Sequence, residues 1–183
     1  GNGTVGRWQP SDGSKLVQVV CGRRHTIMLD EYGRVWTLGN NKYGQLGQQS
    51  SNVDHPTNDD SRKPQLVDVV GCFAIYSGWS HTLALCRDND DKACTTLYGW
   101  GRNDKGQLGM KSSSGHVAIP HKLKTEHQIQ SACCGAESSH IMDTNGNIYS
   151  TGWNEHGNLA TGCQASKEDM SMEWVLTSGV RVV

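Results

Sequence analysis

Short apolar stretches alternate with polar turns along the chain, and this arrangement predicts β-hairpins. Residues 26–29 and 34–38 flank a turn at 30–33, and Asn145-Gly146 is a dipeptide favoured in tight hairpin turns. Apolar runs at 16–20 and 66–70 predict further strands upstream of the hairpins. The strand after each turn carries an apolar residue followed by an aromatic one, at Val35-Trp36, Leu97-Tyr98 and Ile148-Tyr149.

Two linked motifs recur three times. The first contains a glycine followed, in two copies, by His-Thr, and it occupies residues 21–29, 77–85 and, more weakly, 134–142. The second reads Gly-x-Asn-x-x-Gly-Gln-Leu-Gly in its clearest copies and occupies residues 39–47, 101–109 and 152–160. The anchoring glycines of the first motif, Gly22, Gly78 and Gly135, are 56 and 57 residues apart. Such a period is typical of repeat architectures.

The second unit is longer than its neighbours. Gly22 to Gly44 and Gly135 to Gly157 are each 22 residues, whereas Gly78 to Gly106 is 28. The six extra residues fall in the polar stretch 87–96. We therefore expect the hairpin of the second unit to project further than the other two.

A unit of this length with several short strands cannot bury both faces of its own sheet, so it must stack on its neighbours. The fold class predicted is all-β, a β-propeller of four-stranded blades. The alternative is an open solenoid of β units with flatter packing.

Composition agrees with a turn-rich β protein. The 183 residues include 22 glycines, a larger share than the typical value of about 7%. Seventeen basic and 18 acidic side chains give a net charge of −1, which offers little attraction to nucleic acid or anionic lipid. No apolar run approaches the length of a membrane span, and no charged-then-apolar leader opens the chain. We expect a cytoplasmic or nuclear protein without membrane partners.

The seven cysteines show no Cys-x-x-Cys pair and no zinc-finger spacing, so no metal site is expected. Reduced thiols are expected in the cytosol or nucleus. The alternative is a disulfide between Cys86 and Cys94, which flank the predicted hairpin.

At these two motifs the chain resembles the regulator of chromosome condensation family, whose blades carry Gly-x-x-His-Thr followed by Gly-x-Asn-x-x-Gly-Gln-Leu-Gly. The resemblance implies a ring of seven blades, and three repeats supply only part of it. The predicted divisions are the end of a preceding blade, three repeats and the first strand of a following blade, at residues 1–15, 16–65, 66–127, 128–175 and 176–183. Residues 1–6 resemble the remnant of a second motif, and 180–183 resemble 17–20.

The recurring residues have a structural interpretation. An active site needs one constellation, whereas a packing solution is needed in every blade, so His25 and His81 are interpreted as buried hydrogen-bonding pegs that hold loop to strand, with Thr26 and Thr82 as companions. The third copy has Ser138 in place of the histidine. The motif glycines are assigned structural roles in turns and close contacts: Gly22, Gly78, Gly135, Gly44, Gly106 and Gly157.

Candidate contacts for a partner come from variable loop positions and from charge. Trp79 stands where the other copies have Arg23 and Ala136, and an exposed tryptophan can anchor a partner. Partial burial between blades is the alternative for Trp79, and solvated surface is the alternative for the acidic hairpin residues. The candidate set is Trp79, Arg23, Arg24, Asp88, Asp90, Asp91 and Trp153.

No phosphate loop, nucleophile elbow or His-Glu-x-x-His motif is present, so we predict no catalytic residue and no cofactor. The expected function is a non-catalytic scaffold that binds a protein partner. The family resemblance implies a guanine-nucleotide exchange factor for a small GTPase as one version.

A second version follows residues 152–158, which are similar to the late repeat of the α-tubulin suppressor (killer-toxin-insensitivity) propellers and of the secretion-regulating exchange factors. The former resemblance implies partnership with a small metal-binding protein in tRNA wobble-uridine and diphthamide modification. The competing class is an enzyme or ligand-binding propeller with a site in its central channel.

Overall fold

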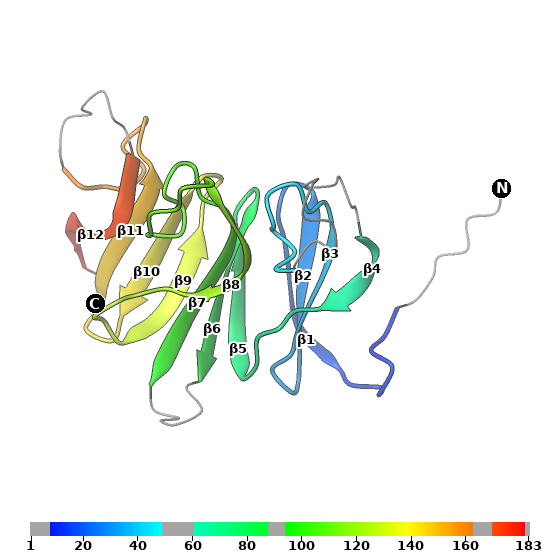
Figure 1. Ribbon diagram of the computed structural model, residues 1–183. Helices are drawn as coiled ribbons and strands as arrows, with labels where there is room; N and C mark the ends of the chain where they lie inside the picture. Colours follow the sequence, from blue (N-terminus) through cyan, green and yellow to red (C-terminus); the bar gives the residue numbers. More distant parts are fainter. Residues whose placement is uncertain (1–7, 49–60, 88–93, 163–169, 182–183) are drawn as a thin grey trace.

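The computed structural model describes residues 8–48, 61–87, 94–162 and 170–181, and these form three sheets standing side by side (Figure 1). The first sheet contains β1 (Leu16–Cys21), β2 (His25–Asp30), β3 (Val35–Gly39) and β4 (Ser61–Leu66). The second contains β5 (Cys72–Ser77), β6 (His81–Arg87), β7 (Thr95–Arg102) and β8 (His116–Lys122). The third contains β9 (Ile129–Cys134), β10 (Ser138–Asp143), β11 (Asn147–Trp153) and β12 (Met170–Arg181).

Each sheet is an antiparallel meander in which consecutive strands pair. The predicted hairpins are confirmed, with Leu29 opposite Val35 in the first sheet and Met142 opposite Ile148 in the third. The prediction of an all-β protein of four-stranded blades is therefore confirmed, and the sheets are called blades one, two and three below.

Apolar side chains that alternate along the strands fill the spaces between blades, since successive residues of a strand point to opposite faces. Ile27 and Leu29 of β2 pack with Ile75, Ala84 and Trp100 of blade two. The second core is built the same way from residues of blades two and three: Leu83, Leu85, Leu97, Leu108, Leu123, Ile129 and Ile141. The blades therefore stabilise one another through these two cores.

The prediction of a strand at 66–70 is wrong beyond its first residue. Leu66 ends β4, and the first strand of blade two is β5, directly before Gly78. Val67 and Val69 instead bury their side chains in the first core as the chain crosses from blade one to blade two. Apolar residues at alternate positions thus marked a buried connection, which cannot be told from a strand by pattern alone.

At the other end of the chain, residues 176–181 continue β12, and Arg181 pairs with Asn147 of β11. Residues 1–6, interpreted as a remnant of a preceding motif, lie outside the described residues. The predicted repeat boundaries stay a prediction.

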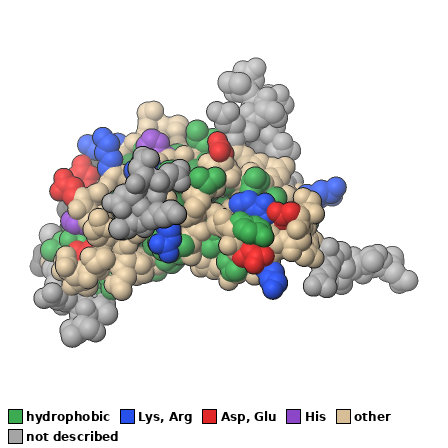
Figure 2. All heavy atoms as spheres, turned by 90° about the horizontal axis from the view of Figure 1, so that it is seen from below, with side chains coloured by type: hydrophobic (Ala, Val, Ile, Leu, Met, Phe, Trp, Pro, Cys, Tyr) green, Lys and Arg blue, Asp and Glu red, His purple; other side chains and the backbone are tan. Residues whose placement is uncertain are grey.

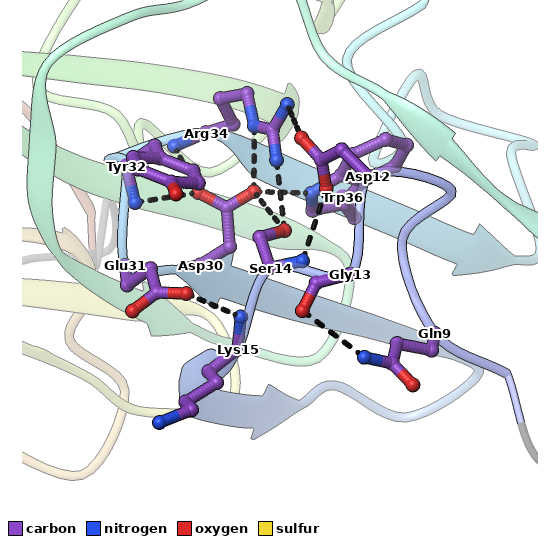
Figure 3. Close-up of polar contacts among 10 residues, drawn as sticks. All are labelled: Gln9, Asp12, Gly13, Ser14, Lys15, Asp30, Glu31, Tyr32, Arg34 and Trp36. Carbon is purple, nitrogen blue, oxygen red and sulfur yellow. Dashed lines mark hydrogen bonds and ion pairs between the residues drawn. The ribbon is translucent and has the colours of Figure 1, made fainter.

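A buried aspartate holds the β2–β3 turn of blade one (Figure 3). Asp30 accepts hydrogen bonds from the backbone N–H groups of Tyr32 and Arg34, from the Arg34 guanidinium at 2.7 Å and from the Trp36 indole at 3.0 Å. Arg34 also forms an ion pair with Asp12 at 2.7 Å. Burial raises the pKa of Asp30, but the bonds from Trp36 and Arg34 outweigh it and keep that pKa below its usual value.

The expected cysteine chemistry is corrected. Cys72 and Cys86 form a disulfide between β5 and β6, so not all thiols are free. Cys86 lies opposite Cys72 on one side and Thr96 on the other, and Cys94, which precedes β7, has no place opposite it in this register. Residues 88–93 of the expected long hairpin lie outside the described residues.

Candidate functional site

Both motifs lie at the same end of every blade. The first motif links the first and second strands of a blade, and the second motif follows the third strand. The last residues of the third strand pair with the first residues of the second strand: His25 with Gly39, and His81 with Gly101. We call this end the motif-loop face. The β2–β3 and β10–β11 turns lie at the opposite end, the hairpin face, which Figure 2 shows from below.

Backbone hydrogen bonds tie the first-motif loops together from blade to blade. The N–H of Arg23 donates to the carbonyl of Trp79, and the N–H of Trp79 donates to the carbonyl of Ala136, both at 3.0 Å. The loops of three blades consequently meet around one shallow hollow of about 380 Å³. Rigid blades thus hold variable loop residues in a fixed arrangement.

The hollow presents a cation and an aromatic ring. Trp79 is 49% exposed, and the Arg23 guanidinium carbon lies 5.2 Å from its ring centroid. Arg24 beside them is exposed. An arginine over a half-exposed tryptophan is a cation–π pair, and both residue types are enriched among the contacts that dominate protein interfaces.

The second-motif loops add further cation–aromatic contacts across blades. Arg102 of blade two lies 5.3 Å from the ring of Tyr43 in blade one, and Lys105 lies 5.7 Å from the ring of Trp153 in blade three. Arg102 also pairs with Asp104 and with Glu137 of blade three. The hydrogen bond that Arg102 donates to the Asp104 carboxylate is the main cause that raises the pKa of Arg102. These contacts join the motif-loop face across all three blades.

The motif histidines connect one blade to the next. His25 Nε2 lies 3.3 Å from the hydroxyls of Thr82 and Ser77, and His81 Nε2 lies 2.9 Å from the hydroxyl of Ser139. Burial lowers the pKa of His25 to about 4 and is the main cause that lowers the pKa of His81 to about 3. Both rings are therefore neutral near pH 7 and contact hydroxyl groups of the following blade.

The roles expected for the two threonines change accordingly. Thr82 partners the histidine of the preceding blade, and Thr26 has its hydroxyl 3.9 Å from the Cys21 sulfur rather than near a histidine. The histidines therefore hold blade to blade, not loop to strand within one blade. The reason is the strand periodicity: adjacent residues point to opposite faces, so His81 faces blade three and Thr82 faces blade one.

Blade three departs from this pattern as its sequence indicates. Ser138 occupies the histidine position at the start of β10. His140 lies two residues further along, 2.7 Å from the Ser150 hydroxyl and 3.3 Å from the Ser138 hydroxyl. Its contacts stay within its own sheet, and burial lowers its pKa.

Two glycines show why the first motif requires a glycine three residues before its histidine. A Cβ atom at Gly22 or Gly78 would collide with the ring of the histidine three residues on. At Gly135 the nearest side-chain atom is the smaller hydroxyl of Ser138. The second-motif glycines instead adopt positive φ, with values of 76° at Gly44, 77° at Gly106 and 74° at Gly157.

The structure gathers part of the candidate set. Arg23, Arg24, Trp79 and Trp153 lie on the motif-loop face. Residues 88–91, with the three candidate aspartates, lie outside the described residues, and the strand ends that flank them, at Arg87 and Thr95, belong to the hairpin face.

Sequence reasoning missed Tyr43, Arg102, Lys105 and Glu137. All four occupy variable positions of the two motifs, so the signal that selected Trp79 could have found them. It missed Ser139 as well. Thr82 and Ser139 occupy equivalent positions in their repeats, because Thr82 follows His81 and Ser139 follows Ser138.

Within the described ranges, no group of three or more His, Cys, Asp or Glu side chains could hold a metal ion. In the same part of the chain, no helix is long and apolar enough to cross a membrane. At the hollow, burial raises the pKa of the Cys134 thiol to about 12, so this group stays protonated.

Comparison with family models places these motifs in a known repeat. The regulator of chromosome condensation (RCC1) repeat matches residues 32–85 and 96–142, and a second model of the same repeat matches 16–45 and 74–107. The chain is 34% identical over 137 residues to Protein RCC2 homolog of Xenopus laevis, covering 74% of this chain and 25% of that protein. It is 29% identical over 154 residues to the ultraviolet-B receptor UVR8 of Arabidopsis thaliana, covering 82% and 32%.

Solved structures agree on the fold. Human WBSCR16 superposes with a TM-score of 0.74 at 24% identity, covering 93% of this chain and 39% of that one. Prp20p of Saccharomyces cerevisiae superposes with a TM-score of 0.72 at 23% identity, covering 91% and 40%. The chain therefore spans about a quarter to a third of the length of these curated relatives, and about two fifths of the solved propellers.

Proposed function

Because the chain belongs to the regulator of chromosome condensation (RCC1) repeat family, we propose that it is part of a non-catalytic scaffold that binds a protein partner through its motif-loop face. The observation that carries this proposal is the Arg23–Trp79 pair. It is half-exposed, it lies where the loops of three blades meet, and backbone hydrogen bonds fix its position.

The physical argument rests on preorganisation. Backbone hydrogen bonds hold the Trp79 loop on both sides, so binding costs little conformational entropy there. A rigid aromatic ring with an arginine beside it supplies apolar area and hydrogen-bond donors together, a combination found at the centres of interfaces. The motif histidines are buried, neutral and engaged with the neighbouring blade, which supports a scaffold rather than an acid–base centre.

The finer version of the proposal is a regulator of a small GTPase. The crystal structure of Prp20p was solved together with a study of its binding to Gsp1p and histones, and yeast RCC1 (Prp20) was solved bound to Kap60. At 23% identity these relatives support the fold, and the partner class comes from the family resemblance. Gsp1p and histones are thus suitable probes for this chain.

The test is direct binding of the purified protein to immobilised Gsp1p and, separately, to histones. We expect binding to at least one of them, weakened by about 10-fold or more in Trp79→Ala, since loss of a central tryptophan commonly costs about 2 kcal/mol. Release of labelled nucleotide from a purified small GTPase, measured with and without the protein, tests for exchange activity.

A matched control lies on the other face. Tyr32 is 68% exposed on the hairpin face, with Arg34 5.3 Å from its ring centroid, so Tyr32→Ala removes a similar pair. We expect Tyr32→Ala to bind as the unchanged protein does. Absence of binding to both probes, or binding that is lost in Tyr32→Ala and kept in Trp79→Ala, contradicts the proposal.

A further inference from the structure

One position has a different chemistry in blade two from that in blades one and three. In the strand registers, Asp30 lies opposite Leu16, Asp143 lies opposite Ile129, and Cys86 lies opposite Cys72. All three positions end the regular part of the second strand of a blade. Blade two therefore has a cysteine where the other blades have an aspartate.

The two aspartates anchor their turns in the same way. Asp143 accepts hydrogen bonds from the backbone N–H groups of Asn145 and Asn147 at 2.8 and 2.9 Å, as Asp30 does from Tyr32 and Arg34. Both carboxylates are buried, at 3% and 1% exposure. A cysteine is a weak acceptor and cannot replace these bonds, so the blade-two hairpin needs another anchor.

The disulfide supplies that anchor. It joins Cys72 at the start of β5 to Cys86 near the end of β6, and the hairpin extends one pair further, to Arg87 opposite Thr95. Both sulfur-bearing residues lie in the core between blades one and two. The bond therefore fixes the base of the longer hairpin at the point where an aspartate fixes the shorter ones.

The anchor of blade two also contacts the anchored turn of blade one. The N–H of Cys72 donates to the carbonyl of Gly33 at 3.1 Å, and the N–H of Arg87 donates to the carbonyl of Gly71 at 3.0 Å. Gly33 belongs to the turn that Asp30 holds. Opening the disulfide thus loosens a connection that runs from the blade-one turn to the blade-two hairpin.

We propose that Cys72 and Cys86 form a redox modification site that sets the rigidity of the blade-two hairpin, a property separate from partner binding. Reduction breaks the Sγ–Sγ bond and adds two electrons and two protons, giving two thiols, while a dithiol reductant loses the same and closes its own disulfide. Because both residues are less than 5% exposed, exchange requires opening of the hairpin base.

Mass spectrometry tests the bond itself. Cleavage after Arg62 and Arg87 yields a peptide of residues 63–87 that contains Cys72 and Cys86 and no other cysteine. In protein isolated under oxidising conditions, we expect this peptide to be lighter by two hydrogens and to resist alkylation until a dithiol is added. A peptide with two alkylatable thiols after oxidation overturns the proposal.

Thermal unfolding and hydrogen exchange test the consequence. A bond that closes a loop with a sequence separation of 14 residues should raise the unfolding midpoint by about 6–12 °C, which dithiothreitol should remove. Reduction should also speed amide exchange at Arg87 and Thr95 and leave the β10–β11 hairpin of blade three, at Asn147, unchanged. Equal midpoints with and without dithiothreitol, or equal exchange at Arg87 and Thr95, contradict the proposed role.

Two variants complete the design. Cys94→Ser removes a free thiol from the same hairpin, and its midpoint should remain as sensitive to dithiothreitol as that of the unchanged protein. Cys86→Ser should be insensitive to dithiothreitol. The unchanged protein with and without reductant decides the question even where Cys86→Ser folds poorly, and a loss of sensitivity in Cys94→Ser would overturn the assignment to Cys72 and Cys86.

Discussion

The second strand begins with a histidine in blades one and two and with a serine in blade three, and the contacts around this position differ accordingly. His25 and His81 reach across to hydroxyl groups of the following blade. In blade three the same position holds Ser138, and His140 forms its contacts with Ser138 and Ser150 of its own sheet. A histidine in this motif is therefore an interblade contact only where its ring starts the second strand and a hydroxyl follows in the next repeat.

This comparison distinguishes the residues that pack the blades together from those that are exposed on the motif-loop face. The most regular features of the repeat are buried between blades, whereas Trp79 and Arg23 occupy its variable positions and are exposed. Burial and hydrogen bonding alone distinguish these two sets of residues. The experiments below perturb the two kinds of blade separately.

The largest expected effect is a loss of stability at acidic pH, caused by the buried histidines His25 and His81. Since burial lowers the pKa of His25 to about 4 and that of His81 to about 3, the unfolded chain binds more protons than the folded chain as the pH falls below 6.5, the usual pKa of histidine. The stabilisation is complete above that value and is lost as the pH falls. Each histidine should lower the free energy of unfolding by up to about 1.4 kcal/mol per pH unit.

The measurement is chemical denaturation at several pH values between about 6.5 and 4. His81→Gln should flatten the slope by about one proton, because glutamine does not titrate. A slope that is the same in this variant would show that other groups cause the pH dependence.

Removing one peg should have the next largest effect. His81→Ala deletes a fully buried ring and leaves the Ser139 hydroxyl without this partner, so we expect a loss of about 2–4 kcal/mol in the free energy of unfolding. Ser138→Ala, at the same position of blade three, should cost less than about 1 kcal/mol. Equal losses would contradict the difference between the blades, and denaturant titration of both variants decides it.

The second-motif glycines give a smaller, matched comparison. Gly106 and Gly157 have φ values of 77° and 74°, so alanine is strained at both by about 1–2 kcal/mol. A Cβ at Gly106 would also collide with the Ser171 carbonyl of β12, whereas none of the described residues lies within 4 Å of one at Gly157. Gly106→Ala should therefore lower the free energy of unfolding by about 1–3 kcal/mol more than Gly157→Ala does. Equal unfolding midpoints in denaturant would contradict this expectation.

Local signals predicted the hairpins and the repeat, because turn residues and strand alternation act over a few residues. The turn at 30–33 and the Asn145-Gly146 turn lie where the sequence places them. The same local reasoning misassigned residues 66–70, since Val67 and Val69 alternate as in a strand but bury in an interblade core.

Contacts between blades were harder to predict because the partners are one repeat apart. His25 meets Thr82 at a separation of 57 residues. Within blade two, Cys86 bonds to Cys72, whereas reduced thiols were expected and Cys94 was the alternative partner. The aligned repeats contain the necessary information: Cys86 aligns with Asp30 and Asp143, and the hydroxyl of Ser139 aligns with that of Thr82. Only the stacking of the sheets shows which aligned residues touch.

A double-mutant cycle on His81 and Ser139 measures most directly whether the repeated motif joins blade two to blade three. Unfolding free energies of the unchanged protein, His81→Ala, Ser139→Ala and the double variant give the coupling between the two side chains. We predict a coupling of about 1 kcal/mol or more, as expected for side chains in direct contact. Additive losses, within about 0.3 kcal/mol, would contradict the interblade peg.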